Sequence, residues 1–134
     1  MLDLMEDFTS PLAASLYFSR SLLGEKDFNE EEKMSFRKRF TDISIPRYFT
    51  LLENSLAKSA SGWVCGNNAT IADARLFQVL QWLTSGMLDG IPTSCISNYP
   101  KLVAFMNKME TYPPVQSWYE KKGNSPYVTS DYVP

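Results

Sequence analysis

The sequence contains no histidine among its 134 residues, and this absence excludes much of the common chemistry of enzymes. Serine–histidine and cysteine–histidine nucleophile pairs are excluded, because both need an imidazole as general base. The commonest metal ligand is missing for the same reason. The two cysteines, Cys65 and Cys95, do not form a zinc site on their own. The sequence therefore predicts neither a triad hydrolase nor a typical metalloenzyme.

Cysteines are few, the net charge is only −2, and no long apolar run is present. Two cysteines are too few for the disulfide framework of a small secreted domain, which favours a reducing, cytoplasmic setting. The small net charge gives no reason to expect a nucleic acid or an anionic membrane as a partner. No signal peptide opens the chain, and no segment approaches the roughly 18 apolar residues of a membrane span.

The charged residues include one basic cluster, Arg-Lys-Arg at residues 37–39, which follows an acidic run at residues 30–32. Opposite charges this close together are typical of a solvated helix face. We therefore expect these arginines to lie in solvent and not to bind phosphate.

Apolar residues make up 44% of the chain, which is enough for the core of one domain but not of two. They recur every three or four positions, which predicts helices, and no segment alternates with the period of a strand. The predicted fold class is all-α. The expected helices cover residues 1 to about 23 with an interruption at Pro11, residues 30–56 with Asn29 as cap and a bend at Pro46, residues 71–84, a helix opening at Pro100 and a short helix after residues 113–114.

The start of the third helix carries the strongest local signal. Thr70 is a good N-cap, because its side-chain oxygen can accept a backbone N–H of the first turn. Asp73, three residues later, can reach back to the N–H of the cap and close a capping box. Its charge also suits the positive end of the helix dipole. We expect both residues to have a structural role and not to contact a substrate.

Three segments together resemble the C-terminal helical domain of cytosolic glutathione transferases, in particular the sigma-like class. They are residues 63–73, which end in the capping box and are followed by Phe-Gln-Val-Leu, residues 45–53 with Pro46, and residues 99–102 with 112–119. The resemblance covers residues 1–121. It implies a helical bundle of that domain type. The glycine, asparagine and prolines that follow predict an irregular tail, residues 122–134, that packs on the body.

In that family an N-terminal thioredoxin-like domain binds glutathione and stabilises its thiolate, and the chain opens directly on what resembles the first helix of the other domain. The resemblance implies a helical substrate-pocket and dimerisation domain for the conjugation of glutathione to apolar electrophiles, a reaction of detoxification. A full-length parent would be an enzyme and a homodimer. The chain alone would be inactive, because only the thiolate attacks and its stabilising donor is absent.

The resemblance also implies site residues. Tyr17 and Ser21 lie where the first helix lines the electrophile pocket, and a tyrosine there can stabilise developing charge; the alternative is that Tyr17 packs against the core or the dimer partner. Asp7 is the acid nearest to the position that binds the glutathione amine across the dimer interface, a position that Pro11 occupies in the best register. Two tail residues, Tyr127 and Tyr132, are candidates to cover the apolar site. Cys65 and Trp118 are expected to be buried.

A second function remains open, a non-catalytic protein-interaction module. Helical domains of this type also occur in translation elongation factors and tRNA synthetase assemblies, where they mediate association. A third interpretation is a generic helical bundle that has converged on this pattern. The coding sequence upstream of Met1 distinguishes the first two, because a thioredoxin-like pattern there indicates the enzyme.

Overall fold

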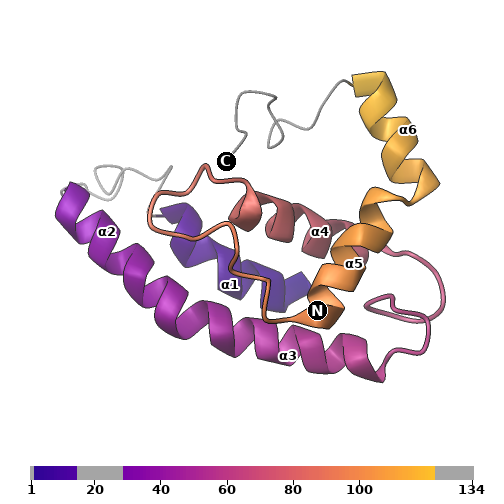
Figure 1. Cartoon of the computed structure of the whole chain (residues 1–134), viewed down its shortest axis with the longest axis horizontal. Coiled ribbons are helices and arrows are strands. Elements are labelled where there is room, and N and C mark those ends of the chain that lie inside the picture. The colour runs from indigo at the N-terminus through magenta and orange to yellow at the C-terminus, as the bar shows by residue number, and fades with distance from the viewer. Residues whose placement is uncertain (1, 15–28, 123–134) are drawn as a thin grey trace.

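The computed structural model describes residues 2–14 and 29–122, and in these ranges the chain forms helices joined by turns, with no strand (Figure 1). This confirms the all-α prediction. The helices are α1 (Leu2–Ala14), α2 (Glu30–Arg39), the π-helical segment η2 (Phe40–Ser44), α3 (Ile45–Lys58), α4 (Ile71–Thr84), α5 (Pro100–Glu110) and α6 (Pro113–Lys122). Helix α1 continues past Pro11, and the part expected at residues 15–23 lies outside the described residues.

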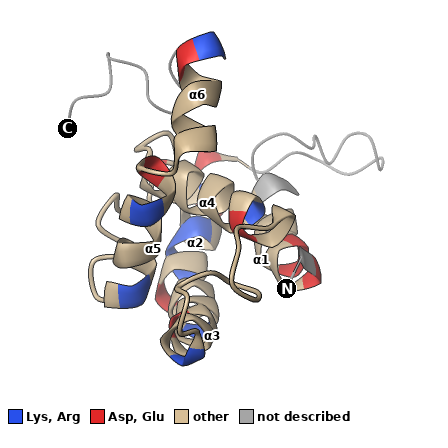
Figure 2. Ribbon diagram, turned by 90° about the vertical axis from the view of Figure 1, so that its right-hand side faces the viewer, with Lys and Arg blue, Asp and Glu red and all other residues tan. Residues whose placement is uncertain are grey.

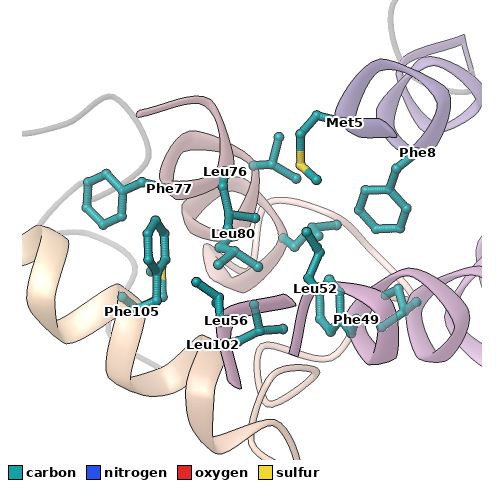
Figure 3. Packing of buried hydrophobic residues seen from close by; sticks show 14 of the residues in the cluster. Met5, Phe8, Phe49, Leu52, Leu56, Leu76, Phe77, Leu80, Leu102 and Phe105 are labelled. Atoms are coloured by element: carbon teal, nitrogen blue, oxygen red, sulfur yellow. The ribbon is translucent and has the colours of Figure 1, made fainter. Parts of the chain in front are cut away.

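Helix α4 is the centre of the core. Half of its residues are buried, including Phe77, Leu80 and Leu83, whose three-residue spacing predicts a single apolar stripe. Side chains from α1, α3 and α5 converge on it, as Figure 3 shows for Met5, Leu52, Leu56, Leu102 and Phe105. Each such fully buried side chain contributes about 1.5–3 kcal/mol through removal of apolar surface from water.

Helices α2 and α3 form one helical rod, because the π-helical turn η2 joins them without a gap (Figure 1). The backbone N–H of Ile45 donates to the carbonyl of Phe40, five residues back. Pro46 explains the wide turn, because a proline ring clashes with the carbonyl four residues earlier and has no N–H to donate. The change of register expected at Pro46 therefore occurs in the turn just before it.

The π-helical turn corrects one part of the predicted apolar stripe. The spacing of Phe36, Phe40 and Ile43 by three and four residues predicts that Ile43 faces the core, but its side chain is 64% exposed. An extra residue in the turn rotates the following positions, so that Ile45 and Phe49 are buried in place of it. Phe40 stays in the core, where its ring centroid lies 5.0 Å from that of Phe8 on α1.

The ends of the helices follow the local sequence signals. Asn29 and Glu32 form a capping box at the start of α2, which confirms Asn29 as the cap. Helix α5 begins at Pro100, directly after its N-cap Tyr99. Its buried residues are Leu102, Phe105, Met106 and Met109. Pro113 opens α6, which extends away from α3 at one end of the molecule (Figure 2).

Three burial predictions were wrong. Arg37, expected in solvent, is only 2% exposed, because the loop after α4 crosses α2. Nη1 of Arg37 donates to the carbonyl of Asp89 in this loop at 2.8 Å. Cys65 is exposed, because the turn buries Trp63 and turns the thiol outward. Trp118 is 59% exposed, because α6 lies at the margin of the core and offers little surface to cover its far side.

Candidate functional site

The loop before α4 is tied to the helix by a single carboxylate. Oδ1 of Asp73 accepts the backbone N–H of Val64 at 2.7 Å, and Oδ2 accepts the backbone N–H of Thr70 at 2.8 Å. Oδ2 also accepts the hydroxyl of Thr70 at 2.8 Å. Because Asp73 is 0% exposed, these three donors replace the water that its charge would otherwise need.

The capping box has the expected partners, but the Thr70 hydroxyl plays a different part in it from the one predicted. The Thr70 side chain lies against the backbone N–H of Asp73, as the box requires, but this N–H also donates to the Thr70 carbonyl at 3.1 Å. The hydroxyl therefore acts mainly as a donor to the carboxylate, and Thr70 itself is exposed. The bond to Val64 was not predicted, since nothing in the local sequence signals a partner nine residues away.

The same loop is held from the other side by α5. Nζ of Lys108 donates to the carbonyl of Ser61 and lies 3.6 Å from the centroid of the Trp63 ring. A cation above an aromatic face is attracted by the ring quadrupole. The loop is thus fixed at both ends, and these polar groups serve the fold.

A groove of about 330 Å³ lies between α1 and the α2–η2–α3 rod, and we call it the α1–α3 groove. Phe8, Phe36, Phe40 and Ile43 supply its apolar surface, and its polar groups are those of Asp7, Arg39, Ser44, Arg47 and Tyr48. Two guanidinium groups and one carboxylate beside aromatic rings suit an organic ligand that carries both an apolar body and charged groups.

The α1–α3 groove contains one of the predicted site residues. Asp7 is exposed and lines this groove. Tyr17 and Ser21 lie outside the described residues, as do Tyr127 and Tyr132 in the tail. Sequence reasoning missed Arg39, Arg47 and Tyr48. Arg39 and Arg47 each lie four residues from Ile43, a spacing that indicates one side of a helix, but the π-helical turn inside the segment disguises it.

A second groove, of about 390 Å³, lies between the first turn of α4 and α6, and we call it the α4–α6 groove. Its lining is mostly apolar and comprises Ala69, Thr70, Ile71, Ala74, Phe77, Met109, Tyr112, Pro114, Val115, Trp118 and Tyr119. The hydroxyl of Tyr119 donates to Oε1 of Gln81 at 3.0 Å, which fixes the base of α6 against α4. The side chains of Ile71 and Trp118 stand at its margin, 74% and 59% exposed.

Two further observations concern metal binding and membrane spans. Within residues 2–14 and 29–122, no cluster of three or more acidic, cysteine or histidine side chains is arranged to hold a metal ion. Among the helices of the same ranges, none has both the length and the apolar character needed to cross a bilayer.

Comparison with known proteins places these features in a family. Residues 6–122 match the model of the glutathione S-transferase C-terminal domain. A stretch of 61 residues is 36% identical to the glutathione S-transferase GstA of Escherichia coli O157:H7. The stretch covers 46% of this chain and 27% of that relative. No solved structure matches the chain significantly. Because the family model spans most of the chain, the protein belongs to the glutathione S-transferase C-terminal domain family.

Proposed function

We propose that this chain is the helical substrate-pocket and dimerisation domain of a glutathione transferase, which conjugates glutathione to apolar electrophiles. The observation that carries the proposal is the α1–α3 groove, where Asp7 lies beside aromatic rings and two arginines. A peptide with an ammonium and two carboxylates, next to an apolar electrophile, needs this combination of groups.

The chemical step is the attack of the glutathione thiolate on an electrophilic carbon. A sulfur–carbon bond forms and the thiol proton leaves with solvent, while a leaving group departs or a polarised double bond takes up the electron pair. A thiolate requires a donor that lowers the thiol pKa, and in this proposal a thioredoxin-like domain supplies it. The helical domain contributes the apolar wall and positions the substrates.

Individual residues receive roles within this proposal. Asp7 binds the glutathione ammonium, and Tyr48 with Arg47 stabilises negative charge that develops on the electrophile. For Tyr17 and Ser21, which lie outside the described residues, we keep the role that the resemblance implies, contact with the electrophile. These roles rest on the proposed function and on the position of the groove.

A homodimer belongs to the same proposal, because Asp7 would serve the glutathione site of the other subunit. Ile43 and Leu51 are large apolar side chains that are exposed on the α2–η2–α3 rod. In this proposal a second subunit covers both side chains. The same observation also supports the second candidate function, a non-catalytic interaction module whose partner covers this rod.

The test is a glutathione-conjugation assay on three proteins: the chain alone, the chain fused behind a thioredoxin-like glutathione-binding domain, and the fusion with Asp7→Asn. We expect no turnover from the chain alone, turnover from the fusion, and a raised KM for glutathione with little change in kcat for the variant. Glu31→Gln, an exposed carboxylate on α2 away from the groove, is the matched control.

Two outcomes contradict the proposal. Turnover by the chain alone would show that it contains its own thiolate donor. An inactive fusion that folds and binds glutathione would favour the interaction module. Sedimentation of the chain tests the dimer separately. We expect the unchanged chain to sediment as a dimer and the interface variants Ile43→Ser and Leu51→Ser to shift it to a monomer.

A further inference from the structure

Arg39 and Arg47 line the α1–α3 groove, and within residues 2–14 and 29–122 neither forms an ion pair or a side-chain hydrogen bond. The neighbouring cation Lys38 does form one, with Asp42 at 2.6 Å. Of the described residues that line the groove, only Asp7 carries the opposite charge. The groove therefore has an excess of positive charge, carried by guanidinium groups whose planar donors suit a carboxylate.

The π-helical turn brings these two arginines to one side of the rod. Arg39 directly precedes the turn, and Arg47 is the third residue of α3. Eight positions of a regular α-helix rotate by about 800°, which is about 80° more than two whole turns. Because a π-helical turn takes up one residue more, the eight positions here rotate by close to two turns. The arginines thus lie on the same side, about 10 Å apart along the axis of the rod. Turns of this kind are frequent at functional sites.

Aromatic side chains form the surface beside the arginines. The ring centroid of Phe8 lies 5.0 Å from that of Phe40 and 4.9 Å from that of Tyr48. Phe36 continues this surface, with its centroid 6.3 Å from that of Phe40. An aromatic ligand can stack on these rings. Asp7 belongs to α1 and repels an anion, so an anionic ligand lies with its charged end towards the rod.

We propose that Arg39 and Arg47 together bind a carboxylate of the electrophile, so that the substrate is an aromatic electrophile that carries an anionic group. Two long side chains on the same side of the rod can converge on one carboxylate from successive turns. The inference rests on the proposed function, because it names the bound anion as the partner of glutathione in the conjugation. Glutathione also has carboxylates, so the experiment separates the two anions.

The binding test uses the full chain with dinitrobenzoate and the neutral dinitrobenzamide, which have the same shape and no leaving group. We expect the carboxylate to shift the Nε–H resonances of Arg39 and Arg47 and to bind about fivefold more tightly than the amide, as for an exposed ion pair. Added salt should reduce this difference, because exposed charges are screened. The Nε–H resonance of Arg37, which is buried away from solvent, should stay in place and report an intact fold.

Two variants test the arginines themselves. Arg39→Gln and Arg47→Gln should each weaken dinitrobenzoate binding by about two- to fivefold and leave dinitrobenzamide binding unchanged. Lys38→Gln is the matched control, since it removes the same charge from an exposed neighbour that does not line the groove. The inference is overturned if the amide binds as tightly as the carboxylate, or if the arginine variants lose no more than the control. It is also overturned if glutathione alone displaces dinitrobenzoate, because the arginines would then bind the peptide.

The fusion with a thioredoxin-like domain separates this inference from the proposed function. Its substrates are chlorodinitrobenzoate and chlorodinitrobenzamide; the thiolate attacks the carbon that bears chlorine, a sulfur–carbon bond forms, and chloride leaves with the electron pair. We expect a lower KM for the benzoate, and Arg39→Gln should remove this preference. Turnover of both compounds with equal KM would overturn the inference and leave the proposed function intact. No turnover of either, with carboxylate binding retained, would refute the proposed function but confirm the arginines as an anion site.

Discussion

The carboxylate of Glu53, in the middle of α3, accepts the backbone N–H of Leu102 at 3.0 Å across 49 positions of sequence. Its second oxygen accepts the N–H of Lys101 at 2.8 Å. Pro100 has no N–H, and the N-cap Tyr99 makes no side-chain capping bond. The first turn of α5 is therefore capped by a residue of another helix, which couples the start of α5 to its packing against α3.

Replacing Glu53 should weaken this coupling. We expect Glu53→Ala to lower the free energy of unfolding by about 1–3 kcal/mol, because it leaves the partly buried N–H of Leu102 and the exposed N–H of Lys101 without their acceptor. Glu53→Gln should lose less, since one oxygen remains. Urea denaturation followed by circular dichroism measures the difference, with the exposed Glu120→Gln as control. A loss no larger than that of the control would mean that water caps α5 equally well.

The two residues of the capping box should not be equivalent. Asp73→Ala removes the acceptor of three donors at a fully buried position, so we expect a loss of about 2–4 kcal/mol. Thr70→Ala removes one hydroxyl from an exposed residue and should lose about 0.5–2 kcal/mol. Thermal and urea unfolding of both variants provides the comparison. Equal losses would show that the bond to Val64 contributes little.

Arg37 offers a test of a buried charge with poor compensation. Its Nη1 donates to the Asp89 carbonyl, but Asp89 Oδ2 is 3.7 Å away on a largely exposed side chain, and Nε is buried without a hydrogen-bond partner. Replacing such a group by an apolar one of similar volume is often neutral or stabilising.

We therefore expect Arg37→Met to change the free energy of unfolding by less than about 1 kcal/mol and Arg37→Ala, which leaves a cavity, to lower it by about 2–3 kcal/mol. Arg39→Ala, at an exposed position, is the control for the loss of charge. If Met and Ala destabilise the protein equally, the hydrogen bond to the Asp89 carbonyl is the dominant interaction.

The two cysteines should differ in reactivity. Burial raises the pKa of the Cys95 thiol from 9.0 to about 11, so about one thiol in a thousand is ionised at pH 8. Cys65 is exposed. At pH 8, iodoacetamide should alkylate Cys65 rapidly in the Cys95→Ser variant and Cys95 slowly in the Cys65→Ser variant. Mass spectrometry measures both rates.

The rate for Cys95 should then rise about tenfold per pH unit up to about pH 11, because only the thiolate attacks. The folded state holds this proton more tightly than the unfolded state, so stability is retained below about pH 9 and declines as the pH rises towards 11. The Cys95→Ser variant should lack this component of the alkaline decline. A pH-independent alkylation rate would contradict the buried position of the thiol.

The site was predicted less completely than the fold. Asp7 was named from the resemblance and lines the α1–α3 groove, whereas Arg39 and Arg47 were not named as site residues. The reason is the π-helical turn, which changes which positions of the rod face α1 and is not encoded by a regular periodicity. The α4–α6 groove was equally hidden, because it depends on where α6 docks and not on any motif.

The sequence by itself determined the main helices, the capping boxes of α2 and α4 and the family, because helix periodicity, capping residues and prolines act within a few positions of the chain. Bonds between distant residues were decided only by the tertiary structure: Glu53 capping α5, Asp73 holding the loop at Val64, and the burial of Arg37 beneath Asp89. Burial and hydrogen-bond partners across dozens of residues depend on how helices pack, and packing is a property of three-dimensional contacts that local patterns do not specify.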